Sequence, residues 1–220
     1  MFVTKKKSKK KQEFESIIDF AKKVYFENPY EIDNLIRLLG KKVQLEYLIY
    51  TIRHENDYQM GEIEPRTVWF DPLQKLGNSG QSLRDLAVNI NEKIEVSLAN
   101  DLVLTNPWNR RRMLNACIHH GENQNRGSWK QDSNHFAELW LPMKITWVGN
   151  GNHSIAAGII QRDGLLSPEE IYDISPVYDA VVCDGDQFID IERDKPISTV
   201  NNVEFCAIYE IGRLIKTANK

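Results

Sequence analysis

The stretch from Lys144 to Gly164, KITWVGNGNHSIAAGIIQRDG, constrains the fold more than any other part of the sequence. Lys144–Val148 is rich in apolar, β-branched and aromatic residues, which predicts a short buried strand. Gly149-Asn150-Gly151 predicts a tight turn, because Gly and Asn tolerate positive φ. His153–Ile160 then predicts a helix of small residues. The stretch therefore predicts a strand, a glycine-rich turn and a helix in direct succession.

Such a turn presents several unpaired backbone N–H groups at the start of a helix, which is a natural site for phosphate. Either Asn150 or Asn152 is expected to cap the helix. His153, at the helix entrance, is the candidate for a direct phosphate contact or for acid–base catalysis. The predicted ligand contacts in this stretch are Gly149, Asn150, Gly151, Asn152, His153 and Ser154. The alternative is an ordinary turn whose glycines only relieve backbone strain.

Arg110, Arg111 and Arg112 form the densest arginine cluster of the chain. A guanidinium group matches two phosphate oxygens, so these side chains and the neighbouring Asn109 are candidates for the same ligand. Three consecutive helical residues point in different directions, so at most two can reach one ligand. A solvated helix face is the alternative. Trp129 lies in a polar segment, where its indole could stack on a base or cover the core.

Two motifs carry a family resemblance. Asn150–Ser154, within NGNHSIAAG, resembles the D-G-x-H-R-like motif of the ParB/sulfiredoxin-like superfamily, and Asn106–Arg111, within LTNPWNRRR, resembles the N-P-x-x-x-R box that precedes it. The resemblance spans roughly residues 100–190 and suits a bacterial or phage protein. It implies a helix start that holds nucleotide phosphates. The motif's Asp is Asn150 here, and its Arg is Ser154.

The resemblance implies a ligand such as ATP or CTP, carried with Mg²⁺, and phosphoryl transfer or NTP hydrolysis if the protein is an enzyme. Two alternatives remain open. One is a nucleic-acid-binding module that uses the same basic and aromatic residues without chemistry. The other is a non-catalytic interaction protein, associated with a phage or mobile element, that binds a protein partner and whose nucleotide site has decayed. The losses at Asn150 and Ser154 favour these alternatives over an active enzyme.

Composition bounds the class of protein. The 220 residues carry a net charge of −3, yet residues 1–12 hold six lysines and no acid. This predicts a disordered basic tail, either solubilising or attracted to nucleic acid. The three cysteines are far apart and odd in number, so reduced thiols are expected rather than a disulfide framework. No apolar run approaches the ~20 residues that span a bilayer, and no secretory signal is visible, so a cytoplasmic protein without a membrane partner is expected.

The predicted fold class is α+β, a small mixed sheet with flanking helices plus an N-terminal helical extension. Residues 1–12 are the tail, 13–98 the helical extension and 99–220 the α+β domain with a C-terminal helix. Apolar periodicity predicts helices at 13–28, 31–39, 43–52, 83–98, 110–120 and 203–217. Strands are expected at 102–105, 136–141, 144–148, 180–183 and 187–191. Gly40 is expected to end a helix, and Ser167-Pro168-Glu169-Glu170 to begin one.

Overall fold

The computed structural model describes residues 7–54, 61–120 and 127–218. The chain divides into two compact units. The first unit comprises Met1–Ile36, Pro65–Ala87 and Ser175–Lys220, and the second comprises Arg37–Glu64 and Val88–Ile174. Both units take segments from each side of residue 98, where the sequence predicts a domain boundary. Helices and small sheets occur together, so the predicted α+β class is confirmed.

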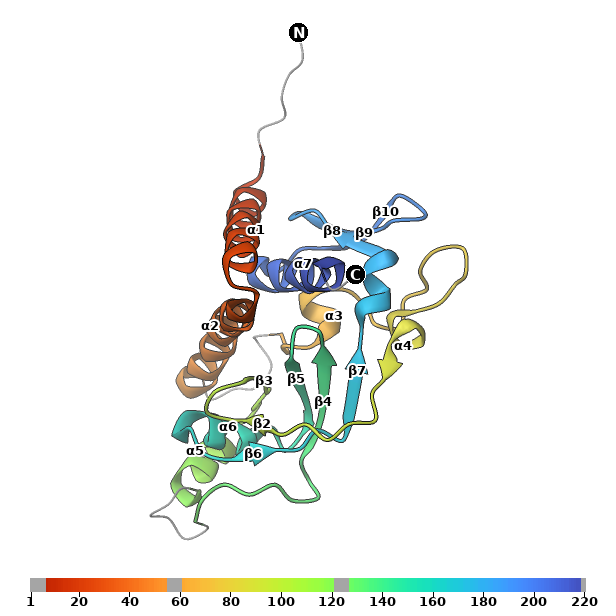
Figure 1. Cartoon of the computed structure of the whole chain (residues 1–220). Coiled ribbons are helices and arrows are strands. Elements are labelled where there is room, and N and C mark those ends of the chain that lie inside the picture. Colours follow the sequence, from red (N-terminus) through yellow and green to blue (C-terminus); the bar gives the residue numbers. More distant parts are fainter. Residues whose placement is uncertain (1–6, 55–60, 121–126, 219–220) are drawn as a thin grey trace. The chain divides into compact units, whose positions relative to one another are not determined.

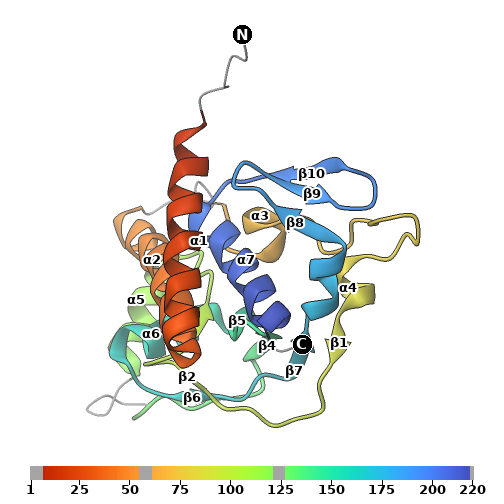
Figure 2. The same ribbon diagram turned by 45° about the horizontal axis from the view of Figure 1, so that its top comes forward.

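The first unit packs the C-terminal helix α7 (Val203–Ala218) between α1 (Lys9–Glu27) and a small antiparallel sheet of strand order β10-β9-β8 (Figures 1 and 2). Its core is aromatic, with Trp69, Phe188 and Tyr209 in edge-on ring contacts. The indole N–H of Trp69 donates to the Phe205 carbonyl oxygen at 2.8 Å. The remaining elements are η1 (Pro29–Glu31), α3 (Pro65–Val68), α4 (Leu83–Leu86), η2 (Ser175–Asp179), β8 (Val181–Cys183), β9 (Gln187–Asp190) and β10 (Lys195–Thr199).

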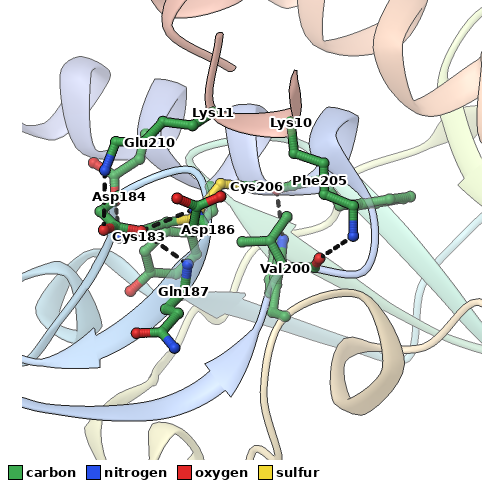
Figure 3. Close-up of a disulfide and its surroundings, with 12 residues drawn as sticks. Lys10, Lys11, Cys183, Asp184, Asp186, Gln187, Val200, Phe205, Cys206 and Glu210 are labelled. Carbon is green, nitrogen blue, oxygen red and sulfur yellow. Dashed lines mark hydrogen bonds and ion pairs between the residues drawn. A yellow bond between two sulfur atoms is a disulfide. The ribbon is translucent and has the colours of Figure 1, made fainter. Parts of the chain in front are cut away.

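The prediction of a disordered tail is wrong for residues 9–12, which form the first turn of α1. Ser8 caps this helix by accepting a hydrogen bond from the Lys11 N–H at 3.0 Å. The Lys10 ammonium donates to the Val200 carbonyl oxygen at 3.0 Å, and Lys11 pairs with Asp184 at 3.3 Å (Figure 3). These lysines therefore have local partners in the first unit. Residues 1–6 of the predicted tail lie outside the described residues.

The prediction of reduced cysteines is wrong for two of the three. Cys183 at the end of β8 and Cys206 in α7 form a disulfide, and Figure 3 shows it beside the start of α1. Both cysteines are buried. They are 23 residues apart in sequence, and only the pairing of α7 with the β8–β9 hairpin brings them together. Cys117 is a free thiol.

The second unit is built on a mixed sheet of strand order β1-β7-β4-β5-β3. β3 runs parallel to β5, β5 antiparallel to β4, and β4 parallel to β7. Figure 1 shows β4, β5 and β7 as neighbouring arrows. The strands of this sheet are β1 (Val88–Asn89), β3 (Leu102–Leu104), β4 (Phe136–Leu141), β5 (Ile145–Asn150) and β7 (Glu170–Asp173). β2 (Val96–Ser97) and β6 (Leu165–Leu166) form a separate pair, and α5 (Arg110–His119) and α6 (Asn152–Gln161) are the helices that follow β3 and β5.

Gly40 does not end a helix, because α2 (Ile32–Arg53) continues through it in place of the two predicted helices. Residues 37–53 of α2 belong to the second unit. Gly40 is buried there against Leu102 of β3, and a Cβ at this position would lie 3.1 Å from the Leu102 Cγ. Gly40 thus allows a close approach of helix and strand, and it does not act as a C-cap.

Two further helix predictions are wrong because strand pairing replaces them. The helix expected over 83–98 stops at Leu86, where Ala87 turns extended, and Val88–Asn89 and Val96–Ser97 pair with β7 and β6. The helix start expected at Ser167 is instead the entry to β7, whose residues pair with β4. Glu169 accepts a hydrogen bond from the Ala137 N–H of β4 at 2.7 Å, so this acid serves the sheet and not a helix N-terminus.

Candidate functional site

The predicted site lies where two neighbouring parallel strands both run into helices. β3 and β5 pair in parallel, with Leu102 opposite Ile145 and Leu104 opposite Trp147. Five residues separate β3 from α5, and a single residue, Gly151, separates β5 from α6. Ligands of α/β sheets bind outside the carboxyl ends of such strands. The two motifs singled out in the sequence therefore meet at one edge of the sheet.

The helices α5 and α6 pack side by side (Figures 1 and 2), and the hydrogen bonds at their two ends show that they run in the same direction. At their starts the Asn109 N–H donates to the His153 Nε2 at 3.1 Å, and at their ends the Gln161 side-chain amide donates to the Cys117 carbonyl oxygen at 3.0 Å. Met113 and Ala156 pack together between these points. Both N-termini consequently lie at one place, and their partial positive charges add. We call Thr105–Arg112 together with Gly151–Ser154 the helix-start cluster.

Asn152 ties the two loops of the helix-start cluster together. Its side-chain oxygen accepts hydrogen bonds from the Thr105 hydroxyl at 2.8 Å and from the Asn106 N–H at 2.7 Å. The expectation that Asn150 or Asn152 caps α6 is wrong, since the N-cap is Gly151 and it makes no side-chain bond. Asn152 instead fixes the loop after β3 against the start of α6.

Gly151 adopts a φ of +83°, as the turn pattern predicts. A Cβ here would overlap the buried His135 ring and lie 3.2 Å from the His135 Cα. Gly151 therefore faces protein. Gly149 and Asn150, predicted as part of the turn, are the exposed last residues of β5. A Cβ on Gly149 would lie 2.8 Å from the Phe136 ring.

His153 is half-buried and engaged by its neighbours. Its Nε2 accepts the Asn109 N–H, and its ring lies edge-on to the Trp108 ring with centroids 5.3 Å apart. This geometry gives the imidazole a positioning role between the two helices. Its catalytic role stays a prediction.

Trp129 belongs to the core of the second unit and is only 3% exposed. Its indole N–H donates to the Ser154 hydroxyl at 2.9 Å, and its backbone N–H donates to the Asp163 carboxylate at 2.8 Å. The ring also contacts His135 edge-on. Of the two roles predicted for Trp129, the structure gives it the covering of the core and leaves no face for a base.

Arg110, Arg111 and Arg112 occupy the first turn of α5 and are exposed. Asn109 is the N-cap and accepts the Arg112 N–H at 2.9 Å. The Arg112 guanidinium carbon lies 4.8 Å from the centroid of the Trp108 ring, a stacking contact that holds this side chain near the helix start. The three arginines therefore add full positive charges to the N-terminus of α5, which already carries a partial positive charge.

The family model described as "Family of unknown function (DUF6710)" matches residues 1–220. The chain belongs to this family. Searches of curated proteins and of solved structures found no match. The ParB/sulfiredoxin-like resemblance thus rests on Asn106–Arg111 and Asn150–Ser154 alone. No helix in the described part of this DUF6710 chain is long and apolar enough to cross a membrane.

The positions of His, Cys, Asp and Glu side chains show where the DUF6710 chain could hold a metal ion. Across residues 7–54, 61–120 and 127–218, no group of three or more His, Cys, Asp and Glu side chains is placed to hold a metal ion. The helix-start cluster itself contains no carboxylate.

Sequence reasoning assigned no site role to Thr105 or His135, and it identified Asn106 and Trp108 only as part of the motif Asn106–Arg111. Thr105 and Asn106 follow a strand and precede a helix, a position where short polar side chains commonly bind backbone groups. That signal was present in the sequence. His135 carried no such signal, because its contact with Gly151 depends on how β4 enters the sheet.

Proposed function

We propose that this DUF6710 protein binds a phosphate-bearing ligand at the helix-start cluster. The observation that carries the proposal is the position of Arg110–Arg112 in the first turn of α5. The N-terminus of α5 lies beside the N-terminus of α6. A cation in the first turn opposes the helix dipole and costs roughly 0.3–1 kcal/mol at low ionic strength. Three such cations in a row are unfavourable for the free protein. A bound anion reverses the sign of this contribution.

Phosphate is the anion whose shape suits these donors. Guanidinium groups bind two phosphate oxygens at once, and helix N–H groups point at the same place. Stacking of Arg112 on Trp108 keeps one guanidinium in position before a ligand arrives. The family resemblance implies a nucleotide such as ATP or CTP as the source of the phosphates.

We propose binding without hydrolysis. The His153 Nε2, which a proton transfer would need, already accepts the Asn109 N–H at 3.1 Å. The position of the superfamily's Asp is Asn150, so no carboxylate is available there as a base. Mg²⁺ enters the proposal only as an ion that the nucleotide's phosphates carry.

Calorimetric titration of the full chain with pyrophosphate, ATP, CTP and GTP, with and without Mg²⁺, tests the proposal. An Arg110→Gln, Arg111→Gln double variant should lose about tenfold or more in affinity, the scale of a lost charge-assisted hydrogen bond. A Lys42→Gln, Arg53→Gln variant removes the same charge from exposed positions of α2 and should bind like wild type.

Equal binding by both double variants would contradict a site at α5. Release of inorganic phosphate from a nucleotide would contradict binding without hydrolysis. Tighter binding to a single-stranded oligonucleotide than to any mononucleotide would favour the nucleic-acid-binding alternative.

A nucleotide ligand also implies the cytoplasmic location expected from the sequence. Disulfides persist mainly in oxidising compartments, although burial slows their reduction. The redox state of Cys183 and Cys206 in rapidly quenched cells therefore tests the proposed location. Reduced thiols would support a cytoplasmic protein, and a fully formed disulfide would argue for an oxidising compartment.

A further inference from the structure

A cavity of about 260 Å³ opens at the far end of α6 from the helix-start cluster. It lies entirely within the second unit, between the Arg37–Arg53 part of α2, the chain around β3 and the last turn of α6. Its walls are mainly apolar, from Leu45, Leu98, Val103 and Ile159. Leu45 leaves 52% of its surface exposed, so the cavity is open to solvent beside an uncovered apolar side chain.

The charged groups at this cavity are unbalanced. Lys41 and Arg162 line it, and Arg37 lies nearby, 3.8 Å from Asp101. Asp101 is the carboxylate of the lining, and it already accepts the Ser97 N–H at 2.7 Å. The lining thus holds two cations, Lys41 and Arg162, and one carboxylate that already accepts a backbone N–H.

Lys41 reaches the cavity from α2 and is anchored at its mouth. Its ammonium donates to the Asn100 carbonyl oxygen at 2.8 Å and to the Ala99 carbonyl oxygen at 3.2 Å, which leaves one N–H bond for a ligand. Burial is the largest cause that lowers the pKa of Lys41. The cations Arg37 and Arg162 lower this pKa further, and the Asp101 carboxylate raises it. The positive potential here is therefore in excess, and a bound anion would relieve it.

Arg162 ends α6 in the left-handed conformation, with φ +56° and ψ +40°. Glycine is the residue that adopts this conformation freely at a helix C-terminus, and other residues do so at a cost. Within the described part of the chain the Arg162 guanidinium has no hydrogen bond or ion pair. A strained backbone that carries an unpaired cation at the edge of a cavity is consistent with use of that side chain in binding.

We propose that this cavity binds a small amphipathic anion, with a carboxylate head held by Lys41 and Arg162 and an apolar body against Leu45, Leu98, Val103 and Ile159. The cavity is smaller than the 300–1,000 Å³ sites of drug-sized molecules, so the body is a short alkyl chain or a single ring. A bare inorganic anion would leave the apolar walls hydrated. A neutral alcohol would leave the cations unpaired.

This site is separate from the proposed phosphate site. The two lie at opposite ends of α6 and share no residue. Failure of either proposal therefore leaves the other standing.

The test is an NMR titration of the full-length chain with sodium octanoate, with octanol and inorganic phosphate as comparison probes. We expect saturable shifts at the Leu45, Val103 and Ile159 methyl groups with octanoate, and at least tenfold weaker effects with octanol. Inorganic phosphate should leave these methyl groups unshifted. Absence of saturable octanoate binding, or octanol binding of equal strength, would overturn the proposal.

Two variants locate the site. Arg162→Gly removes the cation and relieves the left-handed strain, so it should keep or raise the melting temperature while weakening octanoate binding about tenfold or more. Lys144→Gly is the matched control, because it also removes a cation from a left-handed residue, at φ +54°, away from the cavity lining. Wild-type octanoate affinity in Arg162→Gly, or an equal loss in Lys144→Gly, would overturn the assignment.

Discussion

At the scale of single residues, Gly151 meets two requirements at once. Its φ is +83°, and its backbone lies in close contact with the buried His135 ring. Gly151→Ala should therefore lower the free energy of unfolding by more than the left-handed strain alone, about 1–3 kcal/mol in total. Gly127→Ala is the control, since Gly127 has a φ of +66° with nothing near its missing Cβ. Urea denaturation should show the larger loss in Gly151→Ala. Equal losses would mean that contact with His135 is unimportant.

The sequence predicted a helix from His153, one residue after the start of α6, but misassigned its cap and the contacts around it. Positive φ at Gly151 follows from a local rule, so it could be predicted. The partner of His153 and the burial of Trp129 depend on residues more than 20 positions away, Asn109 and Ser154. A pattern within a short motif carries no information about such contacts. The sequence therefore predicted that these residues lie close together, but it did not predict their individual contacts.

At the scale of elements, the buried carboxylate of Asp190 holds β9 to the loop around Gly77. It accepts the Gly77 N–H at 2.8 Å and the Arg193 N–H at 3.1 Å. Burial alone would raise the pKa of Asp190, but these hydrogen bonds and the Arg193 guanidinium outweigh it and lower the pKa. A lowered folded-state pKa contributes stability above the unfolded value, near 3.9, which is lost as pH falls through the folded value.

Asp190→Asn should therefore destabilise the protein at pH 7 by about 1–3 kcal/mol and reduce the loss of stability between pH 5 and pH 2. Asp194→Asn is the matched control, since Asp194 is exposed in the turn between β9 and β10 and Asn tolerates its φ of +50°. Guanidinium denaturation across this pH range measures both effects. An unchanged acid dependence in Asp190→Asn would show that this carboxylate does not link folding to pH.

Several helices and the strands β3, β4, β5, β8 and β9 could be predicted from sequence, whereas the two-residue strands β1, β2 and β6 could not. The apolar spacing over 83–98 fits a helix, yet backbone pairing with β7 and β6 takes most of this stretch. Gly40 is a similar case, because its small size serves contact with Leu102. Local propensity is overridden wherever a segment gains partners distant in sequence.

At the scale of the whole molecule, each unit is assembled from discontinuous segments, which a boundary drawn along the sequence cannot describe. The disulfide depends on this assembly. Cys183 and Cys206 stand in different elements, and neither has a nearby cysteine that would predict a pair. Their spacing alone therefore gave no sign of the bond.

Thiol counting in denaturant tests the disulfide. Without reductant the unfolded chain should present one reactive thiol, Cys117, and after reduction it should present three. A Cys183→Ala, Cys206→Ala variant should lose about 3 kcal/mol of unfolding free energy, because the bond closes a loop of 23 residues. Three thiols before reduction would contradict the bond.

We propose that phosphate binds where α5 and α6 begin together. The most direct measurement is an amide NMR titration of the full chain with pyrophosphate. We expect the amides of Arg110–Arg112 and of Asn152–Ser154 to shift along one common saturation curve, and we expect this response to disappear in the Arg110→Gln, Arg111→Gln variant. Shifts confined to other parts of the chain, or none at saturating pyrophosphate, would contradict it.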